Sequence, residues 1–327
     1  MGDQSIDVVK SYKTMPHKNT TLHRSIMNRR VCIVCMAKRE ENYILEFIHY
    51  HLCLGFDKII LYDNEDSPTY QDLIAQKRPS FLPFVQIIHF PNKPYSKGIL
   101  YVALDHFMQN FMKEYTHAIH MDVDEFIVLK KHPDIKSFIQ EWIDADPTCA
   151  GVGFNWKMFG ASDHPSPFLE DGGSGDFSLV LRFLKCQSGL NRHIKTLFRT
   201  DRMGGYRTVH DIHPTPGCHV KSADTSRHII KGPFHHTSDD SVSQLNHYKT
   251  KTWPEFKTIW SRGAADHPRS SQFNTLRTDE NISAMRHAFD KHNMNDCVDT
   301  TARDFYLRML EHTPNQDSCL HSCPSCP

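Results

Sequence analysis

The chain has 327 residues, 39% of them hydrophobic and 11% aromatic, enough to bury the core of one large α/β domain or two smaller ones. Lysine plus arginine (38) equals aspartate plus glutamate (38), so no excess positive charge favours nucleic-acid binding. No apolar run of about 18 residues occurs, and residues 1–30 lack the apolar part of a signal peptide, so we expect a cytoplasmic protein with no transmembrane segment.

The ten cysteines fall into two kinds of surroundings. Cys32, Cys35 and Cys53 lie inside apolar runs, where a free cysteine behaves as a small core residue. Near the C-terminus, a C-x3-C-x2-C spacing has the form of an iron–sulfur ligand set, but it lies among proline, serine and histidine at the very end of the chain (Cys319, Cys323 and Cys326). We interpret that segment as a solvated tail or an adventitious metal-ligand set.

Short apolar runs alternate with helical periodicity from Val31 onward, which predicts βαβ units and a mostly parallel sheet flanked by helices. Predicted strands cover 31–37, 58–64, 84–90 and 117–128, and predicted helices cover 40–54 and 96–113. Right-handed crossovers would bring the carboxyl ends of these strands to one edge of the sheet. Ligands of open α/β sheets bind at that edge, and four polar side chains fall there at predicted strand ends: Asp63, Asn64, Asp122 and Asp124.

The pattern is looser after Pro147. We expect short strands near 179–184 and 196–199, followed by helices over 253–262 and 276–291. The resulting division is a polar N-terminal extension (1–28), a main domain (29–265) and a C-terminal helix with the cysteine-containing tail (266–327).

The segment Asp122-Val123-Asp124 carries the strongest chemical signal. In an extended chain, residues i and i+2 point to the same face about 6.5 Å apart, so both carboxylates would project together. Two converging carboxylates repel each other unless a cation lies between them. Mn²⁺ or Mg²⁺, bound by these oxygens and by the phosphates of a nucleotide sugar, would supply that charge.

Five motifs in order resemble glycosyltransferase family 92 and its family 2-like relatives of the GT-A superfamily. The matching segments are Lys38–His51 (KREENYILEFIHYH), Leu54–Asn64 (LGFDKIILYDN), Asp122–Phe126 (DVDEF), Asn155–Gly160 (NWKMFG) and Leu245–Thr252 (LNHYKTKT). The resemblance runs from about Val31 to Gly263. It implies a GT-A fold and transfer of a sugar from a nucleotide-diphosphate donor, such as a UDP-sugar, to a hydroxyl of a glycan, protein or small molecule, with inversion.

The resemblance also implies roles for individual residues. Glu40, Asp63 and Asn64 would line the nucleotide pocket, with Asp63 accepting hydrogen bonds from base or ribose. Asp122 would face both the ribose and the metal. Asp124 would be the principal metal ligand, and His247 the third protein ligand. Lys251 would neutralise the diphosphate.

The catalytic base is less well defined. In an inverting transfer a carboxylate takes the proton from the attacking hydroxyl, and the loop after Trp156 offers four acids: Asp163, Glu170, Asp171 and Asp176. We favour Glu170 or Asp171, because this acidic pair resembles the x-E-D element of the superfamily. Leu181 stands where related sequences carry a glutamate, which keeps a non-catalytic carbohydrate- or nucleotide-binding protein open as an alternative.

Two further hypotheses concern ring-bearing side chains. Trp156 and Phe159 could form a platform for a sugar ring, although core packing explains such residues at least as often. A zinc-dependent hydrolase is the second enzyme hypothesis, based on four histidines: His210, His213, His235 and His236. Their spacing does not match a helical H-E-x-x-H arrangement, so we rank the hydrolase lower.

Overall fold

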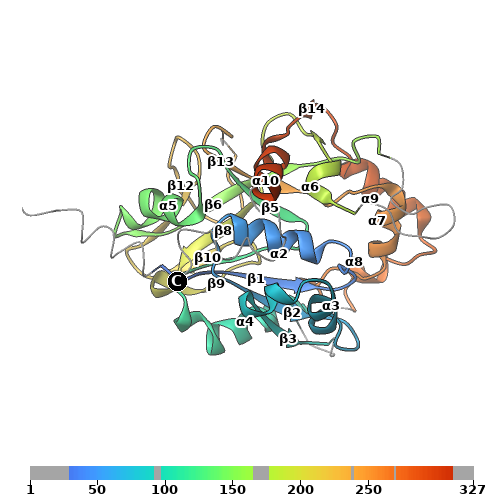
Figure 1. Cartoon of the computed structure of the whole chain (residues 1–327), viewed down its shortest axis with the longest axis horizontal. Helices are drawn as coiled ribbons and strands as arrows, with labels where there is room; N and C mark the ends of the chain where they lie inside the picture. The colour runs from blue at the N-terminus through green and yellow to red at the C-terminus, as the bar shows by residue number, and fades with distance from the viewer. Residues whose placement is uncertain (1–28, 92–96, 165–176, 237–238, 269, 312–327) are drawn as a thin grey trace, which may run out of the picture.

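A computed structural model describes residues 29–91, 97–164, 177–236, 239–268 and 270–311 of the chain. This part of the chain has a mixed α/β fold in which helices flank one large, mostly parallel sheet (Figure 1). The predicted fold class is therefore confirmed, and the arrangement agrees with a GT-A fold.

The large sheet has the strand order β12-β11-β6-β8-β4-β1-β2-β3, and β13 joins β6 to β5 beside this path. Neighbours β1, β2, β3 and β4 run parallel, whereas β8 is antiparallel to both β4 and β6. The strands are β1 (Val31–Ala37), β2 (Lys58–Asp63), β3 (Val85–His89), β4 (His117–His120), β5 (Glu125–Leu129), β6 (Cys149–Met158), β7 (Lys185–Cys186), β8 (Ile194–Arg199), β9 (Met203–Tyr206), β10 (Ile212–Pro214), β11 (His219–Ser222), β12 (Ile229–Ile230), β13 (Ser243–His247) and β14 (Cys297–Val298).

Helices cover both faces of this sheet. They are α2 (Ile44–Cys53), α3 (Tyr70–Lys77), α4 (Ile99–Asn110), α5 (Ile135–Ile139), α6 (Leu179–Arg182), α7 (Trp253–Trp260), α8 (Gln272–Thr275), α9 (Ile282–His292) and α10 (Thr301–Glu311). Short 3-10 or π turns are η1 (Pro79–Phe84), η2 (Met112–Glu114), η3 (Gln140–Asp144) and η4 (Thr200–Arg202). Figure 1 shows α7, α8 and α9 together at one end of the molecule, with α5 at the opposite end. No helix in the described part of the chain is both long and apolar enough to cross a bilayer.

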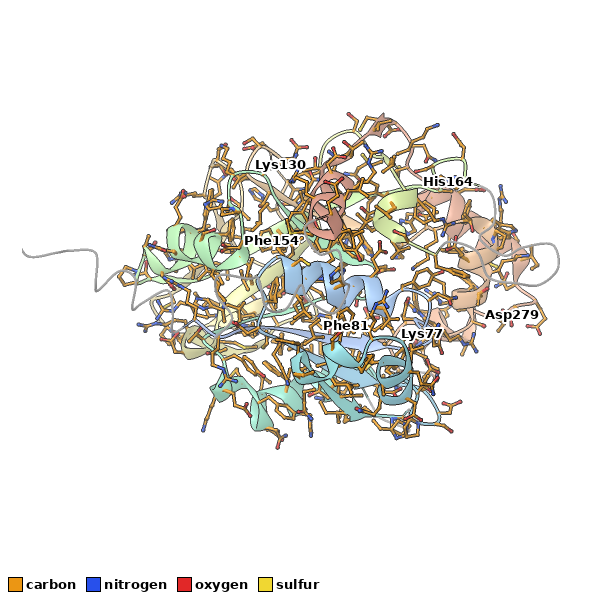
Figure 2. The ribbon with its side chains drawn as sticks, in the orientation of Figure 1. Lys77, Phe81, Lys130, Phe154, His164 and Asp279 are labelled. Atoms are coloured by element: carbon orange, nitrogen blue, oxygen red, sulfur yellow. The ribbon has the colours of Figure 1, made fainter. Side chains whose placement is uncertain are left out.

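Alternation along β1 divides the core into two clusters, one on each face of the sheet. Val31, Ile33 and Cys35 belong to the cluster that contains α2, whereas Cys32 and Val34 belong to the cluster that contains α4. The first cluster also holds the fully buried Phe154 and nearly buried Phe81, both labelled in Figure 2. This two-sided burial is why β1 and β2 are apolar throughout rather than alternating with polar residues.

Several elements differ from the prediction, and each difference has a local cause. The single strand predicted over 117–128 is divided into β4 and β5 by a turn at the two aspartates. The expected strand at 179–184 is instead the helix α6, because Ser178 caps its N-terminus and the Glu46 carboxylate accepts N–H groups of Leu179 and Val180. The last predicted helix begins at Ile282, where the Asn281 side chain caps it, rather than at 276.

Candidate active site

A cavity of about 720 Å³ lies where loops after β1, β2 and β4 meet the end of β13 and the segment between α7 and α8. Lys38, Asn64, Asp122 and His247 contribute to its wall from these four strands. Residues 262–268, which follow α7, also line it. The cavity is therefore at the edge of the sheet where the sequence predicts ligand binding.

Asp122 and Asp124 converge on this cavity through a turn rather than through an extended strand. The turn is closed by the hydrogen bond from Glu125 N to Asp122 O (3.0 Å), and β5 begins at Glu125. Ligand atoms of Asp122, Asp124 and His247 all lie within 4.8 Å of one another. The expectation that residues 122–124 are extended is wrong. The turn nevertheless brings the two carboxylates together, as the sequence analysis expected.

Asp122 is held by two buried groups. The Lys195 ammonium lies 3.2 Å from Asp122 Oδ2 and 3.4 Å from Glu125 Oε2, and the Asp122 N–H donates to Glu125 Oε2 (2.9 Å). Burial would raise the pKa of Asp122, but Lys195 and His120 outweigh it and hold that pKa well below its usual range. Asp122 is therefore an ionised, fixed carboxylate.

Asp124 has a different pair of partners. Lys251 Nζ lies 3.3 Å from Asp124 Oδ2, and His247 Nε2 lies 3.4 Å from Asp124 Oδ1. Burial opposes ionisation here too, yet Lys251 and His247 lower the pKa of Asp124 far below the value of a free aspartate. Both carboxylates of the turn are thus charged at neutral pH.

The three side chains fit a divalent metal by their chemistry. Burial lowers the pKa of His247 despite the nearby Asp124, so its imidazole is neutral and has a lone pair to offer. In the described structure, buried His247 Nδ1 has no hydrogen-bond partner. Two carboxylates and one imidazole form a donor set that suits Mn²⁺, and carboxylates alone suit Mg²⁺.

The residues expected around the nucleotide divide into two groups. Glu40 and Asn64 line the cavity, where Glu40 is paired with Arg262 and Asn64 Nδ2 donates to Phe90 O (2.8 Å). Asp63 is buried outside the described cavity wall. Its carboxylate accepts N–H groups of Glu65 (3.1 Å), Thr69 (2.7 Å) and Tyr70 (3.2 Å), and so shapes the loop after β2. Contact of Asp63 with a base or ribose stays a prediction.

Lys251 has no exposed surface and is not part of the described cavity wall. Its backbone has a positive φ of 54°, and its ammonium lies between Asp124 and the ring of Tyr43 (4.7 Å). Lys249 instead lines the cavity. The motif HYKTK contains both lysines, and period-2 alternation after His247 would place Lys249 and Lys251 on the same side, so the sequence held no signal that separates them.

The acids considered as the catalytic base are mostly beyond what the structure describes. Glu170, Asp171 and Asp176 lie outside the described residues. Asp163 is described: its exposed carboxylate pairs with Lys185, and it does not line the cavity. Leu181, where an acid was expected, packs against the core on α6 and is also not part of that wall, so its identity removes no charged group from the cavity.

Trp156 and Phe159 have separate environments. Trp156 lines the cavity, with its ring stacked on His193 (4.9 Å) and its edge region near His247 (4.4 Å). Phe159 is 1% exposed and packs on Tyr248 (4.7 Å) in the core. A platform role is therefore compatible with Trp156 alone, and the expectation for Phe159 is wrong because the strand turns that ring inward.

The four histidines proposed for zinc do not form a ligand set. Among the described residues, Asp122, Asp124 and His247 are the one group of acidic, histidine or cysteine side chains with metal-ligand proximity. His210 lines the cavity, whereas His235 lies near Asp224 (3.5 Å) and Asn155 (3.2 Å). The zinc-hydrolase interpretation is not supported, because its ligands are dispersed.

Comparison with known families identifies glycosyltransferase family 92. The model of this family matches residues 30–286, a segment that contains the turn at Asp122 and Asp124, His247 and every described cavity-lining residue except His292. A search of curated proteins finds no match to the chain.

Proposed function

The chain belongs to glycosyltransferase family 92 and is a glycosyltransferase; on this premise we propose that it transfers a hexose from a UDP-sugar to an acceptor hydroxyl, with the help of a divalent metal. The acceptor would be a hydroxyl of a glycan, a protein or a small molecule. The observation that carries the proposal is the convergence of Asp122, Asp124 and His247 within 4.8 Å at the wall of a nucleotide-sized cavity.

Asp122, Asp124 and His247 would hold Mn²⁺ or Mg²⁺. The bound ion would neutralise negative charge that grows on the departing diphosphate. The fixed geometry of both carboxylates supports this role, because Lys195 holds Asp122 and Lys251 holds Asp124 in place before any ligand binds.

Other residues of the cavity would orient the donor. Asn64, Glu40 and Trp156 line the cavity; the first two would make polar contacts with the nucleotide, and Trp156 would provide an aromatic surface for a sugar ring. Because Glu40 is already paired with Arg262, its second oxygen, Oε2, is the atom that has no partner in the described structure. We propose that this oxygen accepts a hydrogen bond from the donor.

Removal of the principal ligand tests the metal. Asp124→Asn keeps the size of the side chain but removes its charge, so we expect Mn²⁺ affinity to fall about 100-fold, with a parallel loss of donor turnover. Mn²⁺ binding is measured by electron paramagnetic resonance and turnover by release of UDP. Metal affinity unchanged in this variant would refute the site, and tight UDP–Mn²⁺ binding without turnover of any donor would favour the non-catalytic alternative.

The catalytic base is tested in the acidic pair Glu170 and Asp171. We propose that one of them takes the acceptor proton in an inverting transfer, so Glu170→Gln or Asp171→Asn should lower kcat about 100- to 10,000-fold with little change in donor binding. Donor affinity is measured by calorimetry and the anomeric configuration of the product by NMR. A retained configuration, or full activity in both variants, would contradict this assignment.

A further inference from the structure

Five lysine and arginine side chains line the cavity, and the described residues give only three of them an acidic partner. Lys38 pairs with Asp66, Lys97 with Asp105 and Arg262 with Glu40. Neither Lys249 nor Arg277 has a carboxylate within ion-pair distance in the described part of the chain, although both line the cavity. Two unmatched cations in one concave, partly desolvated space call for an anionic ligand.

The backbone after β13 explains how Lys249 reaches the cavity. The strand β13 ends at His247, and Tyr248 and Lys249 follow it directly without regular secondary structure. Tyr248 is 1% exposed and packs on Phe126 (5.5 Å) in the core, whereas His247 and Lys249 on either side of it both line the cavity. Lys249 is therefore part of the cavity wall two residues after the metal-ligand candidate His247.

Arg277 reaches the same cavity from the segment after α8. Its Nε donates to Trp260 O (3.1 Å), and its guanidinium lies over the rings of Trp260 (4.5 Å) and Phe273 (5.6 Å). These contacts fix the side chain while leaving its terminal N–H groups without a carboxylate partner among the described residues. A guanidinium held in this way is suited to phosphate oxygens.

We propose that Lys249 and Arg277 form the subsite for the diphosphate of the donor, and that this pair, rather than Lys251, holds the phosphates before and after transfer. Lys251 instead serves as the buried counter-ion of Asp124. The inference rests on the proposed function for the identity of the ligand, a nucleoside diphosphate. The unmatched charge that carries it is independent of the metal ligands.

Metal-free inorganic pyrophosphate tests the subsite, because it carries the phosphates without base, sugar or ion. Calorimetry in EDTA should show binding to the full-length wild type, weakened about 10- to 100-fold in Lys249→Met and in Arg277→Met. Lys249→Arg keeps the charge and should stay within a few-fold of wild type. Lys257→Met, an exposed lysine outside the described cavity wall, removes the same charge from the surface and should leave the affinity unchanged.

The outcomes separate this inference from the proposed function. Wild type that fails to bind pyrophosphate, or Lys249→Met that binds it as wild type does, would overturn the subsite. If Lys257→Met loses as much pyrophosphate affinity as Lys249→Met, the effect is one of general charge, and the subsite is also overturned. If the wild type turns over a donor but Lys249→Met binds pyrophosphate as tightly as wild type, the subsite is wrong and the glycosyl transfer stands. If pyrophosphate binding depends on the charges of Lys249 and Arg277 but no donor is turned over, the subsite stands and the proposed transfer is wrong.

Discussion

Each carboxylate of the acidic turn is matched by one buried lysine from a distant part of the chain. Asp122 is matched by Lys195 on β8, and Asp124 by Lys251 after β13. A buried charge without a partner costs several kcal/mol, so these lysines allow two acids to be adjacent in the absence of any ligand. At the scale of single residues, the site is therefore prepared in advance for a cation and its diphosphate.

Loss of Lys195 would expose this dependence. Lys195→Met removes the counter-ion of Asp122 and the ammonium that opposes the burial-driven rise in the pKa of Glu125, so we expect the free energy of unfolding to fall by about 3–5 kcal/mol. Urea denaturation measures this change. In the double variant Lys195→Met/Glu125→Gln a neutral amide replaces the buried carboxyl group beside Asp122, so part of the stability should return. Equal destabilisation of both proteins would contradict the account.

Close backbone contact between elements shapes one side of the cavity. Gly98 precedes α4, and a Cβ placed there would lie 2.3 Å from the backbone carbon of Asp266. Leu100 N also donates to Ala265 O (3.0 Å), so the segment after α7 rests directly on the start of α4. Since Ala265 and Asp266 both line the cavity, packing between these elements sets its width.

A methyl group at this contact should disturb both stability and binding. Gly98→Ala cannot be accommodated by moving a side chain, so we expect a loss of about 1–3 kcal/mol in unfolding free energy together with weaker UDP binding. Thermal unfolding and calorimetry measure the two effects. Gly204→Ala on β9 is the matched control, because the nearest atom to its added Cβ would be His213 O on β10 at 3.3 Å, and Gly204 is not part of the described cavity wall. A stable Gly98→Ala protein with normal UDP affinity would show that the contact is unimportant.

At the scale of the whole molecule, histidines held neutral by burial make stability depend on pH. Burial lowers the pKa of His51 to about 3, of His49 to about 4 and of His292 to about 3. In the unfolded chain these groups titrate near 6.5. Below that pH the unfolded state binds protons that the folded state does not, so stability falls as pH decreases from about 6.5 toward 3–4.

His51 offers the sharpest test of this dependence, because it is fully buried among the rings of Phe47 (4.5 Å) and Phe126 (5.5 Å). Between pH 7 and pH 5 its proton linkage alone should remove about 2 kcal/mol of stability. Urea denaturation at pH 7 and pH 5 gives the loss of unfolding free energy between these pH values for wild type and for His51→Leu. This loss should be about 2 kcal/mol smaller in His51→Leu. An identical pH dependence in the two proteins would contradict the assignment.

The sequence by itself determined the features that depend on short-range patterns. Apolar runs and helical periodicity predicted β1, α2, β2, β3, α4 and α7 close to their observed positions. The acidic turn and the ordered motifs predicted the family, and the match over residues 30–286 confirms it. These features can be predicted from the sequence because periodicity, capping and short motifs depend on residues that are close together in the chain.

Tertiary structure alone decided which charged groups meet. Asp122 and Lys195 are 73 residues apart in the chain, and Asp124 and Lys251 are 127 apart. No local pattern shows that Lys251 turns beneath Asp124 while Lys249 enters the cavity, or that Glu46 on α2 caps α6 and changes an expected strand into a helix. These outcomes follow from burial and from ion pairs between distant segments, whose strength exists only once the chain has excluded water from between them.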